Sequence, residues 1–312
     1  MPQPAQGSIT SGVSDSAPDL DSSLNEFGDD SIAPSISVVI LSYNHPEITE
    51  RCVRSVDEFC QKNSKSADAI HVNKILVHNG SDQKNTDSLK RRFNDWRHLV
   101  ILENKGFSGG ANVGLNAGFE GSDWVMFLTN DCELESLSIP NRPGFFAVPI
   151  RLRKTAKFDS LGGIFNPSRA KLRHCWSLAE VKPSPGEFFY VPGTAFVIHR
   201  NSWNETDGFD EKLGTYWEDV DFSVQAQQRG IAVGLHPDCE VRHAVGKTCH
   251  KNPLYSVYLF QRNRRKVSLK YSRGSRKFMT LFCLLSSHIR LAIKLMKAGR
   301  FNDLGLLVKT WA

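Results

Sequence analysis

The chain has 312 residues, of which 40% are hydrophobic and 23% charged, a balance typical of a soluble globular protein. Its net charge of +6 is unevenly distributed, because residues 1–34 hold six acids and no Lys or Arg, whereas residues 262–312 hold 13 Lys or Arg and one acid. Residues 35–261 balance 26 basic against 26 acidic side chains. This distribution argues against a nucleic-acid-binding face on the body of the protein, and no nucleic-acid partner is predicted.

The seven cysteines are scattered and show no CxxC spacing. This pattern predicts neither a zinc ribbon nor a disulfide framework, and it is typical of reduced thiols in a cytosolic protein. The first residues contain neither a basic n-region nor an apolar h-region, so no secretory signal is predicted. Residues 1–34 are rich in Ser, Asp, Gly and Pro, and we expect a disordered acidic tail there.

Strands alternate with helices in the first half. Residues 36–41 predict a buried strand, and an apolar face predicts a helix over 46–59. A strand in "NKILVHNGS" precedes a predicted helix over 85–97. "LVILENKGFSGGANVGLNAGF" predicts a strand, a glycine-rich loop and a helix, and "DWVMFLTNDCEL" a fourth strand. The alternation indicates a mainly parallel sheet, whose ligands bind beyond the carboxyl ends of the strands, where polar loops follow all four strands here.

The second half changes character. Residues 145–200 contain short strand-like pieces and turn-rich links, which predict a partly antiparallel region. A helix is predicted over 216–230 and a strand over 231–243, with a break or edge at Pro237. From residue 262 onward the chain is predicted to be helical and basic.

Within this last segment, "KFMTLFCLLSSHIRLAIKLMKAGR" combines apolar residues with Arg290, Lys294 and Lys297 at helical spacing. The charges make it a poor transmembrane span. Its periodicity fits equally a helix in the membrane interface and a helix packed on the core.

Two features at the predicted sheet edge suit ligand binding. Asp131 follows an apolar strand, where its carboxylate could bind Mg²⁺ or Mn²⁺ or could simply cap a turn. The glycine-rich "NKGFSGGANVG" could bring backbone N–H groups to an anion at a helix start, or could be a tight turn with close helix packing. It matches neither the P-loop nor the dinucleotide-binding glycine pattern.

An acidic cluster, Glu218, Asp219 and Asp221, directly follows Tyr216 and Trp217. On a helix the three acids cannot all face one site, because Asp219 is turned about 100° from Glu218. Acids near a helix start are stabilised by the helix dipole without any function. The two aromatic residues nevertheless offer a wall against which a carboxylate could act as a general base.

Seven segments in order resemble the family 2 glycosyltransferases, in particular the bacterial rhamnosyltransferase-like group with a GT-A fold. They are "VVILSYNHPE", "ILVHNGS", "NKGFSGGANVGLNAG", "FLTNDCEL", "VPGTAFVIHR", "GFDEKLGTYWEDVDFSVQAQQRG" and "VRH". The resemblance covers about residues 35–270. It implies an α/β GT-A domain over 35–261, with a mainly parallel central sheet and helices on both faces, and a basic amphipathic helical extension over 262–312.

The resemblance also implies a nucleotide-sugar site. Its nucleotide-binding residues would be Tyr43, Asn44, His78, Asn79, Ser81, Gly109, Gly110, Asn112 and Asn130. His78 departs from the family, which usually has an aspartate there that contacts the base of the nucleotide. The identity of the donor base is therefore open, with a pyrimidine favoured.

Catalytic and metal-binding roles carry over in the same way. Asp219 matches the family's catalytic base, with Glu218 as its helper. Asp131 and His243 match positions that hold a divalent Mg or Mn ion. Gly193, Thr194 and Trp217 would lie near the sugar and the acceptor.

The function that the resemblance implies is an inverting, metal-dependent glycosyl transfer from a dTDP-rhamnose-like or UDP-sugar donor. The acceptor would be a saccharide or a lipid-linked saccharide in surface polysaccharide synthesis. The implied location is cytoplasmic and peripheral on the inner face of the cell membrane. Two alternative functions are a sugar-1-phosphate nucleotidyltransferase and a non-catalytic nucleotide-sugar-binding module. The chain resembles the nucleotidyltransferases less, because their basic glycine-rich N-terminal loop is missing after residues 36–41.

Overall fold

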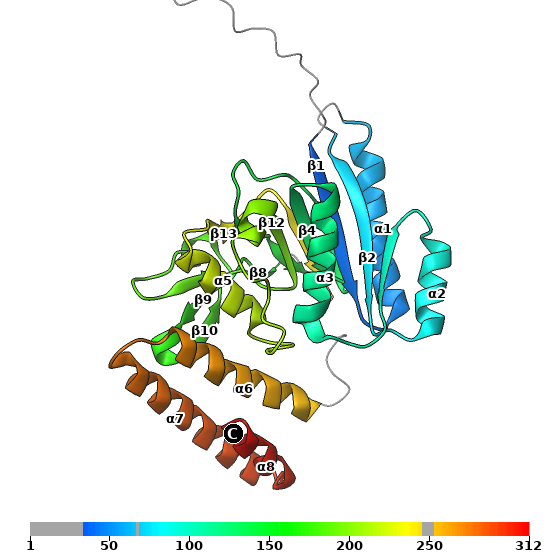
Figure 1. Ribbon diagram of the computed structural model, residues 1–312. Coiled ribbons are helices and arrows are strands. Elements are labelled where there is room, and N and C mark those ends of the chain that lie inside the picture. The colour runs from blue at the N-terminus through cyan, green and yellow to red at the C-terminus, as the bar shows by residue number, and fades with distance from the viewer. Residues whose placement is uncertain (1–33, 67–68, 156, 245–252, 312) are drawn as a thin grey trace, which may run out of the picture. The chain divides into compact units, whose positions relative to one another are not determined.

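A seven-stranded sheet organises the body of the chain in the computed structural model (Figure 1), which describes residues 34–66, 69–155, 157–244 and 253–311. The strand order is β13-β6-β12-β4-β1-β2-β3. Neighbours from β4 to β3 pair in parallel, whereas β12 is antiparallel to both β4 and β6. The strands are β1 (Ser35–Ser42), β2 (His71–Asn79), β3 (Arg97–Ile101), β4 (Trp124–Thr129), β6 (Phe145–Ala147), β12 (Ala195–His199) and β13 (Val233–Leu235). The predicted mainly parallel sheet is confirmed.

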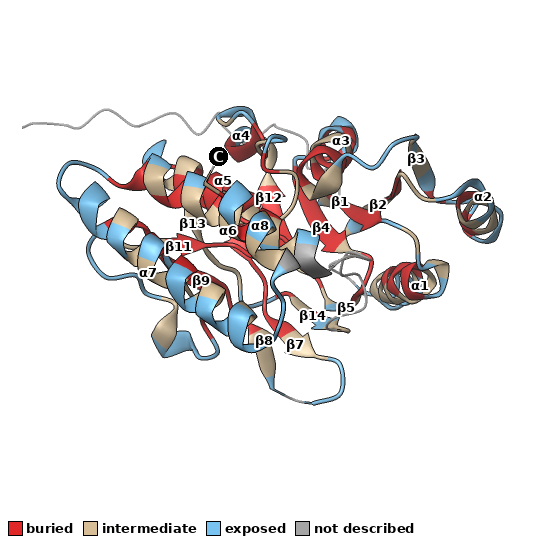
Figure 2. Ribbon diagram, turned by 90° about the horizontal axis from the view of Figure 1, so that it is seen from below, coloured by how far each residue is buried: buried red, intermediate tan, exposed pale blue. Residues whose placement is uncertain are grey.

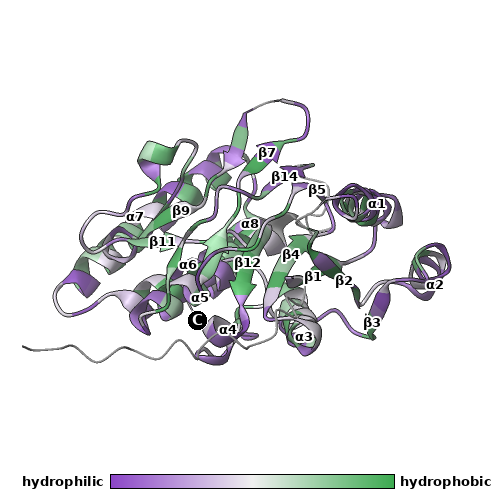
Figure 3. Ribbon diagram, turned by 90° about the horizontal axis from the view of Figure 1, so that it is seen from above, coloured by the Kyte–Doolittle hydropathy of each residue, from purple (hydrophilic) through white to green (hydrophobic). Residues whose placement is uncertain are grey.

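Helices cover both faces of this sheet. Alternate residues of β1 enter different cores, because Val38 packs with α1 (Pro46–Asn63) and α2 (Gln83–Arg92), whereas Val39 packs with α3 (Gly106–Gly121). Figure 3 shows the central strands as the most hydrophobic part of the fold. The packing of α3 is close, since a Cβ on Gly114 would lie 2.7 Å from the Val39 side chain.

Two smaller sheets carry the antiparallel region predicted for the second half. One has the order β5-β14-β7-β8 and the other β10-β9-β11. Their strands are β5 (Cys132–Ser136), β7 (Ile150–Leu152), β8 (Phe158–Ser160), β9 (Gly163–Asn166), β10 (Lys171–His174), β11 (Phe188–Tyr190) and β14 (Glu240–His243). Short helix η1 (Pro167–Arg169) connects β9 to β10 and η2 (Leu178–Glu180) connects β10 to β11, whereas α4 (Arg200–Asn204) follows β12.

Four helices complete the chain: α5 (Glu218–Gln228), α6 (Pro253–Tyr271), α7 (Arg276–Lys297) and α8 (Asn302–Lys309). Helix α6 spans the predicted domain boundary at residue 261, and residues 33–312 form one compact unit. Lys270 of α6 pairs with the buried Asp221 of α5 at 2.8 Å. The first part of the predicted extension is therefore packed on the body. The predicted disordered tail, apart from Pro34, lies outside the described residues.

The helix predicted over 46–59 continues to Asn63, and three further predicted bounds also differ from the structure. The helix predicted over 85–97 ends at Arg92, because Phe93 and Trp96 turn into the core and β3 then starts at Arg97. The strand predicted over 231–243 is divided into β13 and β14, on either side of Pro237. The helix predicted from residue 216 begins at Glu218.

Candidate active site

Two adjoining cavities lie at the carboxyl edge of the central sheet. The first, which we name the edge cavity, has a volume of about 170 Å³, and the second, the Asp219 cavity, about 300 Å³. Both are lined by Phe107, Thr129, Thr215 and Tyr216, so they lie on either side of the same residues. The other residues that line the edge cavity are Leu41, Tyr43, Asn79, Asn104, Gly106 and Asn130.

Three of the predicted nucleotide-binding residues, Tyr43, Asn79 and Asn130, therefore line the edge cavity. The Asn79 amide is fixed by α3, because its Oδ1 accepts from the Lys105 N–H at 3.0 Å and its Nδ2 donates to the Gly106 carbonyl at 2.8 Å. The Asn130 amide donates to the Thr49 hydroxyl at 2.9 Å. These polar groups are held in place before any ligand arrives.

The loop after β1 carries two further predicted residues. Asn44 and His45 both adopt left-handed backbone, with φ of 53° and 51°. The Ser81 hydroxyl accepts a hydrogen bond from the Asn44 N–H at 3.0 Å and so ties the loops after β1 and β2 together. Non-glycine residues in this region of φ are strained, and such strain concentrates at functional sites. Neither Asn44 nor Ser81 lines the edge cavity.

His78 is fully buried and does not line the edge cavity. Its Nε2 lies 2.9 Å from His98 Nδ1, and His98 Nε2 lies 2.8 Å from the Phe93 carbonyl. Because a carbonyl only accepts, His98 donates to Phe93 and accepts from His78. Burial, with His98 adding to it, lowers the pKa of His78 to about 4 and keeps the ring neutral. The predicted contact between His78 and the donor base thus finds no support in the cavity lining.

The glycine-rich segment is the start of α3 rather than a loop. Gly109 and Gly110 are buried in its first turns, where a Cβ on Gly110 would lie 2.7 Å from Leu41. Its first N–H groups are already used, since Phe107 N donates to Thr215 Oγ1 at 3.3 Å and Ser108 N to the Gly214 carbonyl at 2.9 Å. The alternative of close helix packing describes this segment, and the N–H groups of Phe107 and Ser108 are engaged within the protein.

Asn112, the third predicted residue on this helix, faces away from the edge cavity. Its amide exchanges two hydrogen bonds of 3.0 Å with the backbone of Phe209. It thereby ties α3 to the segment that leads toward the acidic cluster, instead of lining the cavity.

Asp219 lies in the wall of the second cavity, in the first turn of α5. Its Oδ2 accepts a hydrogen bond of 3.0 Å from the Gly193 N–H, and its Oδ1 one of 2.8 Å from the Val220 N–H. Thr194 also lines the cavity, and its carbonyl accepts from the Thr129 N–H at 2.9 Å. The predicted catalytic and acceptor-side residues Glu218, Asp219, Gly193, Thr194 and Trp217 all line this one cavity.

The two neighbouring acids differ in their surroundings. Burial raises the pKa of Asp219, but the N–H groups of Gly193 and Val220 and the nearby His174 act in the opposite direction. Burial, and then the charge of Asp219, raises the pKa of Glu218 well above its usual range, and Glu218 Oε2 has no hydrogen-bond partner among the described residues. Of the two acids, Asp219 is therefore the one whose ionised form is the better stabilised.

Among the lining residues of the Asp219 cavity that sequence reasoning missed are two that carry polar groups close to each other, His174 of β10 and Tyr190 of β11. The Tyr190 hydroxyl lies 3.3 Å from His174 Nδ1. Burial, followed by the Asp219 charge, raises the pKa of Tyr190. Tyr190 immediately precedes the segment "VPGTAFVIHR", a signal that was present, whereas nothing local marks His174 because the pairing of β10 with β9 brings it here.

The aromatic wall predicted beside the acids is present. Tyr216 and Trp217 both have φ of 73°, in the left-handed region, directly before α5. The Trp217 ring is 2% exposed and makes edge contacts with Phe165 and with Phe260 of α6. Helix α6 also holds this strained turn, because Asn263 Nδ2 donates to the carbonyls of residues 213, 215 and 216 at 2.9, 3.1 and 2.7 Å.

The two predicted metal ligands lie together. β5 and β14 pair so that His243 Nε2 is 3.3 Å from Asp131 Oδ2, and His243 Nδ1 is 2.9 Å from Asp159 Oδ2. Burial disfavours the charged ring, but the hydrogen bonds to the two aspartates outweigh it and raise the pKa of His243 to about 9. Among the described residues, no three His, Cys, Asp or Glu side chains are arranged as a metal-binding group. The donors suit a hard divalent cation chemically, provided that His243 gives up its proton.

Comparison with known sequences finds mycobacterial relatives. N-acetylglucosaminyl-diphospho-decaprenol L-rhamnosyltransferase of Mycobacterium tuberculosis is 23% identical, over 73% of this chain and 86% of the relative. An uncharacterized protein of Mycobacterium bovis is 27% identical, over 47% of this chain and 57% of its own length. No protein-family model matches the sequence.

Among solved structures, GalNAc-T7, crystallised with UDP, GalNAc and Mn²⁺, superimposes with a TM-score of 0.55 at 16% identity. The match covers 80% of this chain and 50% of GalNAc-T7, so the chain spans about half the length of that protein. The likeness shows the fold, and the sequence relatives agree with it. The chain is a glycosyltransferase of the GT-A fold that resembles the rhamnosyltransferase-like group of family 2.

Proposed function

We propose that this chain transfers a sugar from a nucleotide-diphosphate sugar to a hydroxyl of a saccharide or lipid-linked saccharide, with inversion at the anomeric carbon. The observation that carries the proposal is the position of Asp219. Asp219 lines a cavity that adjoins the cavity at the sheet edge and shares with it the lining residues Phe107, Thr129, Thr215 and Tyr216. A donor in the edge cavity would thus place its sugar toward Asp219.

The reaction needs one base. Asp219 accepts the proton of the acceptor hydroxyl while the acceptor oxygen attacks the anomeric carbon, and the bond from that carbon to the diphosphate breaks on the opposite face. The Gly193 and Val220 N–H groups hold the Asp219 carboxylate in one orientation. Glu218, kept neutral by burial, adds no second negative charge and orients the acceptor. A single displacement of this kind inverts the anomeric configuration.

Asp131 and His243 would hold a Mg²⁺ or Mn²⁺ ion, with Asp159 as a further oxygen donor beside them. When bound, such an ion offsets the negative charge that develops on the leaving diphosphate. The hydroxyl of Thr129, a residue that lines both cavities, donates to Asp131 Oδ1 at 2.7 Å and so links this group to them.

The relatives support the classes of donor and acceptor. The mycobacterial relative is named as a rhamnosyltransferase that acts on a diphospho-decaprenol-linked sugar, and the GalNAc-T7 structure holds UDP and Mn²⁺. We infer a dTDP-rhamnose-like or UDP-sugar donor and a lipid-linked acceptor for surface polysaccharide. A cytoplasmic enzyme held peripherally at the inner membrane face would meet such an acceptor.

The test measures nucleoside diphosphate release from a panel of nucleotide sugars, with Mn²⁺ or Mg²⁺, for wild type and Asp219→Asn. Loss of the base is expected to lower turnover by roughly 10²- to 10⁴-fold. The melting temperature should stay close to that of wild type, because an amide oxygen can still accept the Gly193 N–H. Asp207→Asn, at an exposed aspartate on the segment before α5, is the matched control and should retain full turnover.

Two results would contradict the proposal. One is normal turnover in a folded Asp219→Asn variant, which would remove Asp219 as the base. The other is turnover that persists in EDTA, which would remove the divalent cation. Release of pyrophosphate from a nucleoside triphosphate and a sugar phosphate would instead indicate the nucleotidyltransferase alternative.

A further inference from the structure

Helix α7 exposes a continuous apolar stripe, which we name the α7 stripe. Phe278, Phe282 and Ile289 within it are 77%, 68% and 59% exposed. The whole stripe recurs at helical spacing and consists of Phe278, Phe282, Leu285, Ile289, Ile293 and Met296. At 1.5 Å per residue it runs for about 27 Å along one side of the helix. Figure 2 shows the same helix as largely exposed along its length.

The other sides of α7 are different. Thr280, Leu284 and His288 are buried and, at 100° per residue, lie on the side of the helix away from the stripe. Thr280 donates to the Pro167 carbonyl of η1 at 3.2 Å. Contrary to the expectation from its charges, α7 has the length and apolar composition of a transmembrane span, but crossing a bilayer would require its docked side to leave the fold.

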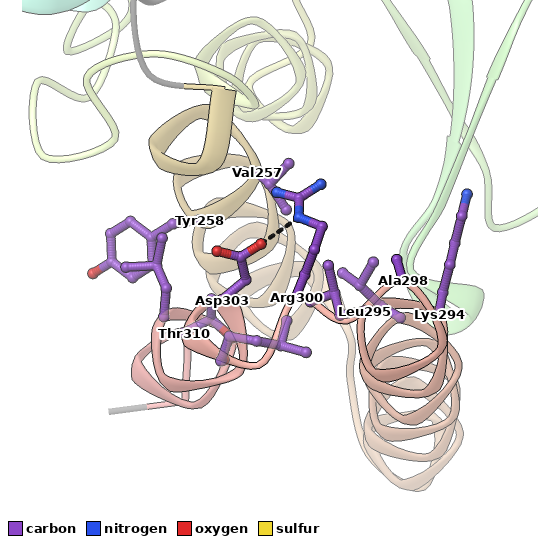
Figure 4. Close-up of a pocket in the computed structure, with 11 residues that line it drawn as sticks. Val257, Tyr258, Lys294, Leu295, Ala298, Arg300, Asp303 and Thr310 are labelled. Atoms are coloured by element: carbon purple, nitrogen blue, oxygen red, sulfur yellow. Dashed lines mark hydrogen bonds and ion pairs between the residues drawn. The ribbon is translucent and has the colours of Figure 1, made fainter.

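The third side is basic. Arg290, Lys294 and Lys297 lie roughly 80–140° around the helix from the stripe, and α7 contains no acidic residue. The single acid after residue 261, Asp303, is paired with Arg300 beside the cavity between α6, α7 and α8 (Figure 4). Asp303 therefore offsets Arg300, and within the described part of the chain none of Arg290, Lys294 and Lys297 forms an ion pair.

Helix α7 thus has one side docked on the protein, one exposed apolar side and one basic side. This combination suits a membrane surface. We propose that the α7 stripe inserts into the interface of a bilayer that contains anionic lipids, with α7 parallel to the membrane plane and its basic side at the headgroups. A second copy of this chain fits poorly, because two α7 helices facing each other would bring their Arg and Lys residues together without a partner acid.

Helix α6 lies between α7 and the Asp219 cavity. Phe260 of α6 lines the Asp219 cavity, while Val257 and Tyr258 of the same helix line the cavity that α7 and α8 help to form. The membrane-facing helix thus lies one helix layer, about 10 Å, from the helix that borders the active site (Figure 1). This consequence rests on the proposed function: a lipid-linked acceptor would reach Asp219 while its lipid stays in the bilayer.

The experiment measures flotation of the full-length protein with vesicles of phosphatidylcholine, with and without phosphatidylglycerol. Binding is expected on the anionic vesicles. Phe278→Ser combined with Phe282→Ser should weaken it at least roughly tenfold. Lys294→Gln with Lys297→Gln should weaken it roughly thirtyfold on anionic vesicles and leave binding to neutral vesicles unchanged. Leu102→Ser, at a position 88% exposed after β3, is the matched control and should bind as wild type does.

Each contrary outcome overturns the docking. The proposal is wrong if wild-type protein remains unbound in the presence of anionic vesicles. It is also wrong if the variant with both Phe278→Ser and Phe282→Ser binds these vesicles as strongly as wild type does. A dimer of the wild type in solution that the same variant dissociates would assign the stripe to a second copy instead. Nucleoside diphosphate release in the absence of vesicles is measured in parallel. If wild type lacks that activity but binds vesicles, the proposed function fails and the docking stands.

Discussion

At the scale of single residues, the three acids of the acidic cluster differ in their burial and in their hydrogen-bond partners. Asp219 has two backbone N–H donors on its carboxylate, which stabilise the ionised form. Glu218, the residue before it, is 5% exposed and has one carboxylate oxygen without a partner among the described residues. Asp221 is buried but is paired with Lys270 and belongs to the contact between α5 and α6. Only Asp219 combines ionisation with a place in the cavity wall.

Glu218 makes stability depend on pH. Its raised pKa means that the folded chain holds a proton that the unfolded chain releases, so stability falls as pH rises from the ordinary glutamate pKa toward the folded value. Glu218→Gln removes the ionisable group and with it this decrease of stability at high pH. We expect the variant to melt at a higher temperature than wild type at pH 8 and at a similar temperature near pH 4, with each unit of raised pKa corresponding to about 1.4 kcal/mol.

Thermal melts across this pH range check the prediction. Glu58→Gln, at an exposed glutamate on α1, is the control and should follow the wild-type curve. A Glu218→Gln variant that melts below wild type at pH 8 would show that ionised Glu218 stabilises the fold.

At the scale of elements, the catalytic turn is held from outside its own segment. Residues 213–217 precede α5, and their left-handed conformation at Tyr216 and Trp217 is strained. Asn263 of α6 is fully buried and donates to three carbonyls of this turn. The β10-β9-β11 sheet supplies His174 and Tyr190 from the other side of the cavity. The active site is thus an assembly of elements far apart in sequence.

Asn263→Ala should therefore affect both stability and catalysis. Loss of the hydrogen bonds leaves buried carbonyls without partners, and we expect the free energy of unfolding to fall by about 2–3 kcal/mol. Turnover, measured well below the melting temperature, should fall at least tenfold because the turn no longer fixes the start of α5. Denaturant titration and nucleoside diphosphate release measure the two effects.

Lys266→Ala, at an exposed position of the same helix, controls for changes in helix propensity and should leave both quantities near wild type. If Asn263→Ala lost stability but kept wild-type turnover, Asn263 would hold the fold without positioning the catalytic turn.

At the scale of the whole molecule, the C-terminal helices belong to the body and also present a new surface. The two alternatives for α7, a helix packed on the core and a helix for the membrane interface, describe two sides of one helix. Its inner side buries Leu284 completely and contacts η1, and His288 Nε2 lies 2.9 Å from the Thr310 hydroxyl that follows α8. Its outer side carries the α7 stripe.

Deletion of residues 276–312 should consequently destabilise the remaining chain. It uncovers η1 and the end of α6, and we expect the melting temperature to fall by roughly 10 °C. The double variant at Phe278 and Phe282, which changes only exposed positions, should keep the wild-type melting temperature. A deleted chain that melts as wild type does would show that the segment is an independent appendage, as the predicted boundary at 261 implied.

The sequence by itself determined the alternation of strands and helices, because buried strands are short apolar runs and α1 has one apolar face. It also determined the strand ends at Tyr43, Asn79 and Asn130, since polar residues after parallel strands must meet at one edge. Asp219 was marked by its motif. These features are local, or follow from the topology of a parallel sheet.

Only the tertiary structure decided the rest, because it depends on contacts between distant segments. Side-chain direction placed His78 against His98 and outside the cavity. Packing against β1 and β2 made the glycine-rich segment a helix. Antiparallel pairing brought His174 to Asp219, and β8 brought Asp159 to His243. The N–H groups of Gly193 and Val220, which no motif encodes, made Asp219 chemically different from the adjacent Glu218 although both are enclosed.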